Sequence, residues 1–134
     1  MMKTMLKCKI HRATVTDAQL HYEGSVTVDR TLMDAGGLVE YEQVHIWNVD
    51  NGNRFTTYVI EGPADSGVIC LNGAAARQVN KGDLVIIAAF SAYDEKELAN
   101  FHPTLVYVDG KNRITDVKRK IDSESQRPRV ASAV

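Results

Sequence analysis

The chain has 134 residues, with 16 Lys and Arg against 17 Asp and Glu, which gives a net charge of −1. This length suits one domain with a single core, and the balanced charge argues against a nucleic-acid-binding protein, which usually carries a strongly basic face. The two cysteines, Cys8 and Cys70, stand far apart, so we expect reduced thiols in a cytoplasmic protein rather than a disulfide framework or a zinc site.

The first predicted element is a half-buried strand over residues 4–16, where apolar and polar side chains alternate. Its apolar face comprises Leu6, Cys8 and Ile10, and its polar face comprises Lys7, Lys9 and His11. Taken alone, Lys9 and His11 are typical of a solvated face. The lysines also break up the apolar runs, unlike a signal peptide, and no segment approaches the roughly 18 apolar residues of a membrane span.

Short elements follow one another after this strand. Residues 16–19 are expected to cap a short helical turn. The β-branched residues 25–28 predict a strand. Residues 31–35 predict a short helix that ends at Gly36 and Gly37.

A β-hairpin is predicted around the turn Asn51-Gly52. Its two strands are expected over residues 44–49 and 54–60. Strict alternation places Arg54 and Tyr58 on one face of the return strand and Thr57 on the other. A bulge or a strand end would bring all three side chains into one site.

The second half of the chain continues as short strands between turns. Strands are expected at residues 68–71, 84–90 and 104–108, and a short helix at residues 94–100. Residues 72–77 predict a turn that opens a helix, whose free backbone N–H groups would face an anion; an ordinary glycine turn is the alternative. Many short strands with little helix favour a small β-barrel domain over residues 1–120, followed by a mobile tail over residues 121–134.

The pair Gly24-Ser25 carries a specific chemistry when its surroundings allow it. Glycine leaves the peptide carbonyl unshielded, and the serine hydroxyl can reach back to that carbonyl. An acyl shift from nitrogen to oxygen, followed by elimination and hydrolysis, would leave a pyruvoyl group at a new N-terminus. An ordinary surface turn is the alternative for these two residues.

Four blocks in order give this pair a context: HYEGS at residues 21–25, IWNV at 46–49, NGNRFTTY at 51–58 and NGAAA at 72–76. Together they resemble the aspartate 1-decarboxylase family from about Met1 to about Val117. The resemblance implies a mainly β fold, a six-stranded double-psi β-barrel with a few short helices. It also implies self-cleavage between Gly24 and Ser25 into a β chain of residues 1–24 and an α chain of residues 25–134.

The resemblance also assigns roles to individual residues. Ser25 becomes the pyruvoyl group, and Tyr58 returns a proton to the substrate, which suits a hydroxyl that is protonated at neutral pH. The implied substrate-binding residues are Lys9, Arg54, Thr57, Gly73, Ala74 and Ala75. The implied processing residues are His11, Tyr22, Gly24, Ser25 and Asn72, with Thr57 as a further oxyanion donor. Arg54 suits a carboxylate clamp, since a guanidinium binds a carboxylate through two charge-assisted hydrogen bonds.

The implied activity is the decarboxylation of L-aspartate to β-alanine and CO2 through a Schiff base, for pantothenate and coenzyme A biosynthesis. The pyruvoyl group takes the place of pyridoxal phosphate, and no metal is expected. The family is tetrameric with active sites between subunits, and a helper protein for maturation is left open as a partner. The alternatives are decarboxylation of another acidic amino acid such as glutamate, and a non-enzymatic barrel that binds a partner or a small acid.

Overall fold

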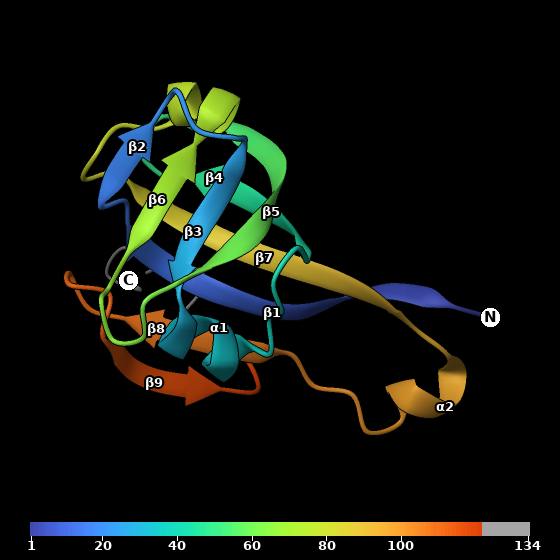
Figure 1. Ribbon diagram of the computed structural model, residues 1–134. Coiled ribbons are helices and arrows are strands. Elements are labelled where there is room, and N and C mark those ends of the chain that lie inside the picture. The colour runs from blue at the N-terminus through green and yellow to red at the C-terminus, as the bar shows by residue number, and fades with distance from the viewer. Residues whose placement is uncertain (122–134) are drawn as a thin grey trace, which may run out of the picture.

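The computed structural model describes residues 1–121 and consists mainly of strands (Figure 1). The strands are β1 Lys3–Thr14, β2 Asp17–Gln19, β3 Ser25–Asp29, β4 Gln43–Asn48, β5 Arg54–Gly62, β6 Ile69–Asn72, β7 Leu84–Tyr93, β8 Thr104–Val108 and β9 Ile114–Lys118. The helices are α1 Arg30–Gly36, α2 Glu95–Leu98 and the 3₁₀ helix Gly73–Gln78. The predicted tail, apart from Ile121, lies outside the described residues.

The strands form one sheet that closes into a barrel. Their hydrogen-bonded order is β2-β6-β3-β5-β4-β7-β1-β8-β9. Only Val15 and Thr16 separate β1 from β2, and the Thr16 N–H donates to the Ile69 carbonyl of β6 at 2.8 Å. Because β1 and β2 therefore act as one bent strand, paired with β7 at one end and β6 at the other, the sheet must curve back on itself.

The closed ring contains six strands: β1 continued by β2, then β6, β3, β5, β4 and β7, while β8 and β9 extend the sheet from β1 (Figure 1). Parallel pairs, β1 with β8 and β3 with β5, occur among antiparallel ones. The predicted fold class, a small, mainly β, six-stranded barrel with a few short helices, is confirmed. No helix between residues 1 and 121 has the length and apolar character needed to cross a bilayer.

The barrel interior is filled by every second side chain of its strands. Fully buried members of this core include Ile10, Val26, Val28, Ile46, Val59, Val85 and Ile87. Since successive strand residues point to opposite faces, Ser25 and Thr27 of β3 point away from the core that Val26 and Val28 fill. The candidate site residues of β3 thus lie on the outer face of the barrel.

One predicted element is wrong. Residues 16–19 were expected to form a helical turn, but Asp17–Gln19 form β2, which pairs in parallel with Cys70, Leu71 and Asn72 of β6. Three residues carry little intrinsic preference, so the available edge of β6 decides their conformation.

Most other predicted elements are confirmed with shifted ends. The hairpin β4–β5, the strand β3 and the helix α1 lie where they were expected, and α1 ends at Gly37, whose φ of 73° is left-handed. β7 continues to Tyr93, beyond the expected end. The helix after Asn72 is a 3₁₀ helix, and β9 was not predicted.

Candidate active site

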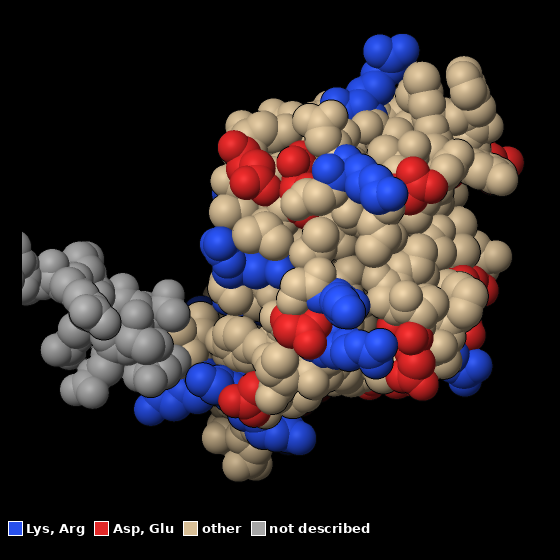
Figure 2. Space-filling view, turned by 90° about the vertical axis from the view of Figure 1, so that its left-hand side faces the viewer, with Lys and Arg blue, Asp and Glu red and all other residues tan. Residues whose placement is uncertain are grey.

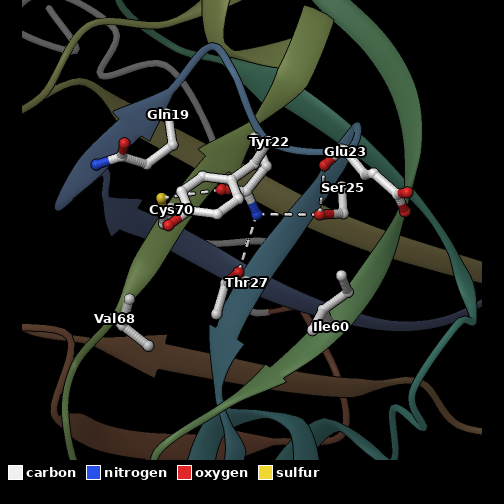
Figure 3. A pocket seen from close by; sticks show the side chains of 9 residues that line it. Gln19, Tyr22, Glu23, Ser25, Thr27, Ile60, Val68 and Cys70 are labelled. Carbon is white, nitrogen blue, oxygen red and sulfur yellow. Dashed lines mark hydrogen bonds between the residues drawn. The ribbon is translucent and has the colours of Figure 1, made fainter.

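Ser25 is the first residue of β3 and is fully buried, although it is a polar residue on the outer face. Its hydroxyl donates to the Glu23 carbonyl at 3.2 Å and accepts from the Asn72 side-chain amide at 3.0 Å (Figure 3). Ser25 and Asn72 are directly opposite each other in the antiparallel pair β3–β6. The sheet register therefore holds the Asn72 amide, a hydrogen-bond donor, beside the Ser25 hydroxyl.

A cavity of about 630 Å³ opens beside this hydroxyl. It is lined by Gln19, Tyr22, Glu23, Ser25, Thr27, Ile60, Val68, Cys70 and Asn72 (Figure 3). Apolar walls with a few convergent polar groups are typical of a small-molecule site. A pyruvoyl group formed at position 25 would fit here, because the serine side chain already faces this space.

Gly73 brings the chain against the predicted cleavage position. Its φ is 66°, and a Cβ built on it would lie 2.6 Å from the Gly24 nitrogen and 2.7 Å from both the Gly24 Cα and the Tyr22 carbonyl oxygen. A side chain cannot occupy that space without moving backbone. The lack of a side chain at Gly73 therefore allows the segment 22–24 to pack directly against it.

Tyr58 lies on the strand next to Ser25. The parallel pair β3–β5 begins with Val26 opposite Val59, so Ser25 and Tyr58 are the residues that directly precede this pair on the two strands. Val26 and Val59 are both core residues, so Ser25 and Tyr58 share the outer face. Thr57 lies on the other face of β5, the one that Val59 shares, and does not line the cavity.

Arg54 stands apart from this cavity. The pairing of β4 with β5 runs without a shift from Gln43–Tyr58 to Trp47–Arg54, so the bulge considered from the sequence is not present in β5. Arg54 lies on the same face as Tyr58 but roughly 13 Å along the strand, at about 3.3 Å per residue. Its guanidinium carbon is 4.7 Å from the centre of the Trp47 ring.

Lys9 and His11 lie on β1, between β7 and β8. The His11 ring meets the edge of Tyr107 at 5.4 Å, and its buried Nδ1 has no hydrogen-bond partner within residues 1–121. Burial lowers the pKa of His11, and Lys9 and Arg12 lower it further; burial also lowers the pKa of Lys9. Burial therefore acts against the charged form of both side chains.

Charge on one face of the molecule is mixed rather than of one sign. On the face turned 90° from Figure 1, Lys and Arg side chains lie beside Asp and Glu side chains (Figure 2). In the part of the chain described, no three His, Cys, Asp or Glu side chains are grouped to hold a metal ion.

The family follows from comparison of the whole chain. The family model described as aspartate decarboxylase matches residues 1–115. The chain belongs to the aspartate decarboxylase family. The resemblance read from four short blocks is thus confirmed, and with it the prediction of a decarboxylase enzyme.

Several proteins that are similar to this chain are named aspartate 1-decarboxylase. The protein of Dehalococcoides mccartyi strain 195 is 60% identical over 90% of this chain and 98% of its own length. The protein of Syntrophus aciditrophicus is 61% identical over 85% and 98%, and that of Stenotrophomonas maltophilia is 55% identical over 91% and 97%. Among solved structures, the rationally designed mkDPBB_sym_86 protein aligns with a TM-score of 0.44 at 17% identity, over 57% of this chain and 90% of that chain.

The structure thus groups part of the predicted decarboxylase site and separates the rest. Tyr22, Gly24, Ser25, Asn72 and Gly73 are together around one bond and one cavity. The side chains outside that cavity are Lys9, His11, Arg54, Thr57, Tyr58, Ala74 and Ala75. The roles assigned to all of these residues stay predictions.

Sequence reasoning missed Thr27, Ile60 and Cys70, which line the cavity. Thr27 is two residues after Ser25 on β3, and Cys70 is two residues before Asn72 on β6, so each shares a face with a predicted residue. The signal that would have found Thr27 and Cys70 is this period of two, combined with the pairing of β3 with β6. Ile60 follows from the same period, two residues after Tyr58 on β5.

Proposed function

We propose that this protein is a pyruvoyl-dependent enzyme that converts L-aspartate to β-alanine and CO2. It is made as an inactive precursor in the cytoplasm, and its β-alanine serves pantothenate and coenzyme A biosynthesis. The observation that supports this most strongly is the buried Ser25 hydroxyl, held beside the Gly24–Ser25 bond by Asn72 and facing a cavity. An ordinary surface serine needs neither the burial nor the fixed donor.

Cleavage begins when Ser25 Oγ attacks the Gly24 carbonyl carbon. The new C–O bond replaces the C–N bond, and the hydroxyl proton passes to the released nitrogen of residue 25. Loss of the Cα proton then expels the Gly24 carboxylate, which ends the β chain and leaves dehydroalanine at position 25. Water converts this residue to a pyruvoyl group and releases ammonia.

The surrounding residues assist this cleavage in different ways. Asn72 donates to the attacking oxygen at 3.0 Å, and Gly73 allows the backbone of residues 22–24 to pack directly against it. Thr57, two residues before the first β3–β5 pair, serves as the donor to the oxyanion that develops on the Gly24 carbonyl. Each such donor typically contributes about 100- to 1,000-fold to an acyl-transfer rate.

In the mature enzyme, the pyruvoyl group supplies a carbonyl that accepts the electron pair left when a carboxylate departs as CO2. Tyr58 delivers a proton to the substrate Cα; this role is supported by its position directly before the first β3–β5 pair, as Ser25 is on β3. Thr57 and the backbone from Gly73 to Ala75 hold the polar groups of the substrate, with Lys9 assisting. Arg54 binds a substrate carboxylate.

A homotetramer with active sites between subunits completes this proposal. Arg54, Lys9 and His11 lie outside the cavity beside Ser25 of their own chain. Arg54 packs on Trp47, which itself lies 6.3 Å from Phe90, so a guanidinium and two aromatic rings share one outer surface. A second chain placed across this surface would combine the separated parts of the site.

The proposal is tested by intact-mass spectrometry of the purified chain over time. We expect two products, residues 1–24 ending in a free carboxylate and residues 25–134 beginning with a ketoacyl group that borohydride reduces. Ser25→Ala is the matched control and should stay whole. The cleaved sample is then assayed for decarboxylation of aspartate and of glutamate in parallel. The proposal is refuted if the wild-type chain remains whole and inactive even when cell extract is supplied as a source of a helper protein.

A further inference from the structure

The side chain of Asn72 has a hydrogen-bond partner at each of its polar positions. Its Nδ2 donates to Ser25 Oγ at 3.0 Å and to Thr27 Oγ1 at 2.9 Å, so both amide hydrogens are used. Its Oδ1 accepts from the Cys70 thiol at 3.3 Å (Figure 3). The amide is therefore held from two sides by residues that sequence reasoning did not assign.

We propose that Cys70 and Thr27 are positioning residues for the cleavage after Gly24, because together they hold the Asn72 amide with its N–H group directed at Ser25. This inference rests on the proposed function, since it concerns the rate of the same cleavage. It adds two residues that line the cavity and act on the cleavage through Asn72.

The sheet register is what brings these four side chains together. In the antiparallel pair β3–β6, Ser25 is opposite Asn72 and Thr27 is opposite Cys70. Residues two apart on a strand share a face, and opposite residues share it too. The two cross-strand pairs are therefore neighbours on one face, and Asn72 can reach Ser25, Thr27 and Cys70 at once.

The thiol decides which way the amide points. Hydroxyl groups can donate or accept, so Thr27 alone would tolerate either orientation of Asn72. The Ser25 hydroxyl uses its single hydrogen on the Glu23 carbonyl and offers a lone pair to Asn72. Burial and the nearby Asp17 raise the pKa of Cys70, so its thiol stays protonated and donates to Oδ1; its contact with the Leu71 carbonyl is longer, at 4.0 Å.

The orientation matters because of the charge that develops during cleavage. As the Ser25 hydroxyl gives up its proton, its oxygen carries negative charge until the C–O bond forms, and the Asn72 N–H donor at 3.0 Å favours that charge. The oxyanion of the tetrahedral adduct itself forms on the Gly24 carbonyl. A reversed amide would direct Oδ1 at the Ser25 oxygen and oppose its charge. Each loss of a positioning contact should therefore lower the fraction of chains that are ready to react.

The experiment compares cleavage rates of precursor chains under identical conditions, using intact-mass spectrometry. Cys70→Ala and Thr27→Val remove one contact each, whereas Cys70→Ser and Thr27→Ser keep a polar group at the same place. Cys8→Ala is the matched control, since Cys8 is also a buried thiol but packs in the core. Thermal unfolding of every chain, followed by circular dichroism, separates positioning from loss of fold.

We expect Cys70→Ala and Thr27→Val to slow cleavage by about two- to tenfold each, the usual worth of one hydrogen bond. Both serine variants should recover most of the rate, and Cys8→Ala should match the wild type. If either contact-removing variant cleaves at the wild-type rate, that residue does not position Asn72. If the serine variant is as slow as its partner, volume rather than hydrogen bonding is responsible, and the inference is again wrong.

These outcomes are distinct from failure of the proposed function. If the wild-type chain does not cleave, the proposed function is refuted before any variant is compared. If the wild type cleaves and Ser25→Ala does not, the variants at positions 27 and 70 test the positioning inference alone. Should Cys70→Ala fail to fold, the Thr27 pair still decides whether Asn72 needs its neighbours.

Discussion

The Tyr58 hydroxyl is proposed to act after the cofactor has formed, when the substrate is protonated. The cleavage argued above uses the Ser25 hydroxyl, Asn72 and the Gly24 carbonyl, whereas the Tyr58 hydroxyl is needed only when the substrate Cα takes up a proton. Tyr58→Phe keeps the ring and its 6.3 Å packing with Tyr41. We expect this variant to fold and cleave normally, but to form β-alanine roughly 10²- to 10⁴-fold more slowly, the usual worth of a positioned general acid.

The measurement for Tyr58→Phe is β-alanine formation, normalised to the amount of cleaved chain. Near-normal turnover would mean that water or another side chain delivers the proton. An uncleaved Tyr58→Phe chain would instead place this hydroxyl in the cleavage step.

Gly73 allows a second prediction with an internal control. In Gly73→Ala the new Cβ would overlap the Gly24 backbone, so the segment around the cleavage bond must move. Gly82 also has a positive φ, of 95°, but a Cβ there meets nothing within 4 Å. Both alanine variants carry a similar left-handed backbone cost of about 1–2 kcal/mol, but only Gly73→Ala should lose most of its cleavage.

Cleavage of the two glycine variants is followed by intact mass and their stability by urea unfolding. Equal cleavage in Gly73→Ala and Gly82→Ala would show that close approach at Gly73 is unimportant for the reaction.

At the scale of elements, the sequence predicts well wherever one local pattern decides the structure. The β4–β5 hairpin follows from alternation around Asn51-Gly52, and the end of α1 follows from Gly37. The helical turn predicted at residues 16–19 was wrong because the three residues of β2 take their conformation from β6, which lies about fifty positions later in the chain. The motif residues around Gly24 were found by resemblance, but Cys70 and Thr27 needed the β3–β6 register, which no local pattern specifies.

Asn112, in the turn between β8 and β9, gives a prediction about how the elements are held together. Its buried side chain accepts from the Thr14 N–H at 2.7 Å and donates to the Thr14 and Gly67 carbonyls at 2.8 Å each. It thereby ties the end of β1 to the loop before β6, where the barrel closes. Glycine tolerates the φ of 60° at this position, so Asn112→Gly isolates the loss of these hydrogen bonds.

We expect Asn112→Gly to lower the free energy of unfolding by about 2–4 kcal/mol, because buried backbone groups lose their partners. Urea unfolding of the Ser25→Ala background, which removes the complication of cleavage, measures this change. The exposed Asn100→Gly is the control and should cost less than about 1 kcal/mol. Equal midpoints for the two variants would show that the Asn112 contacts do not stabilise the closure of the barrel.

At the scale of the whole molecule, the predicted catalytic groups occupy different surfaces of one chain. The cavity beside Ser25 holds the reacting position, and Arg54 lies farther along β5 against Trp47. A guanidinium that is to bind the carboxylate of a small substrate must come within hydrogen-bond distance of it. The arrangement is explained if Arg54 of one chain serves the Ser25 site of another chain in a symmetric assembly.

Mixing two inactive variants tests whether sites are shared between chains. Ser25→Ala retains Arg54 but forms no cofactor, and Arg54→Ala forms the cofactor but should bind aspartate about 2–5 kcal/mol more weakly. Arg54→Lys should recover only part of this loss, since lysine lacks the bidentate fork. If the two alanine variants are co-expressed in equal amounts and assort at random, a site built from two chains is complete in roughly one quarter of cases. Decarboxylation at about a quarter of the wild-type rate is therefore expected, with light scattering reporting a tetramer, whereas an inactive mixed tetramer would place Ser25 and Arg54 of each site in the same chain.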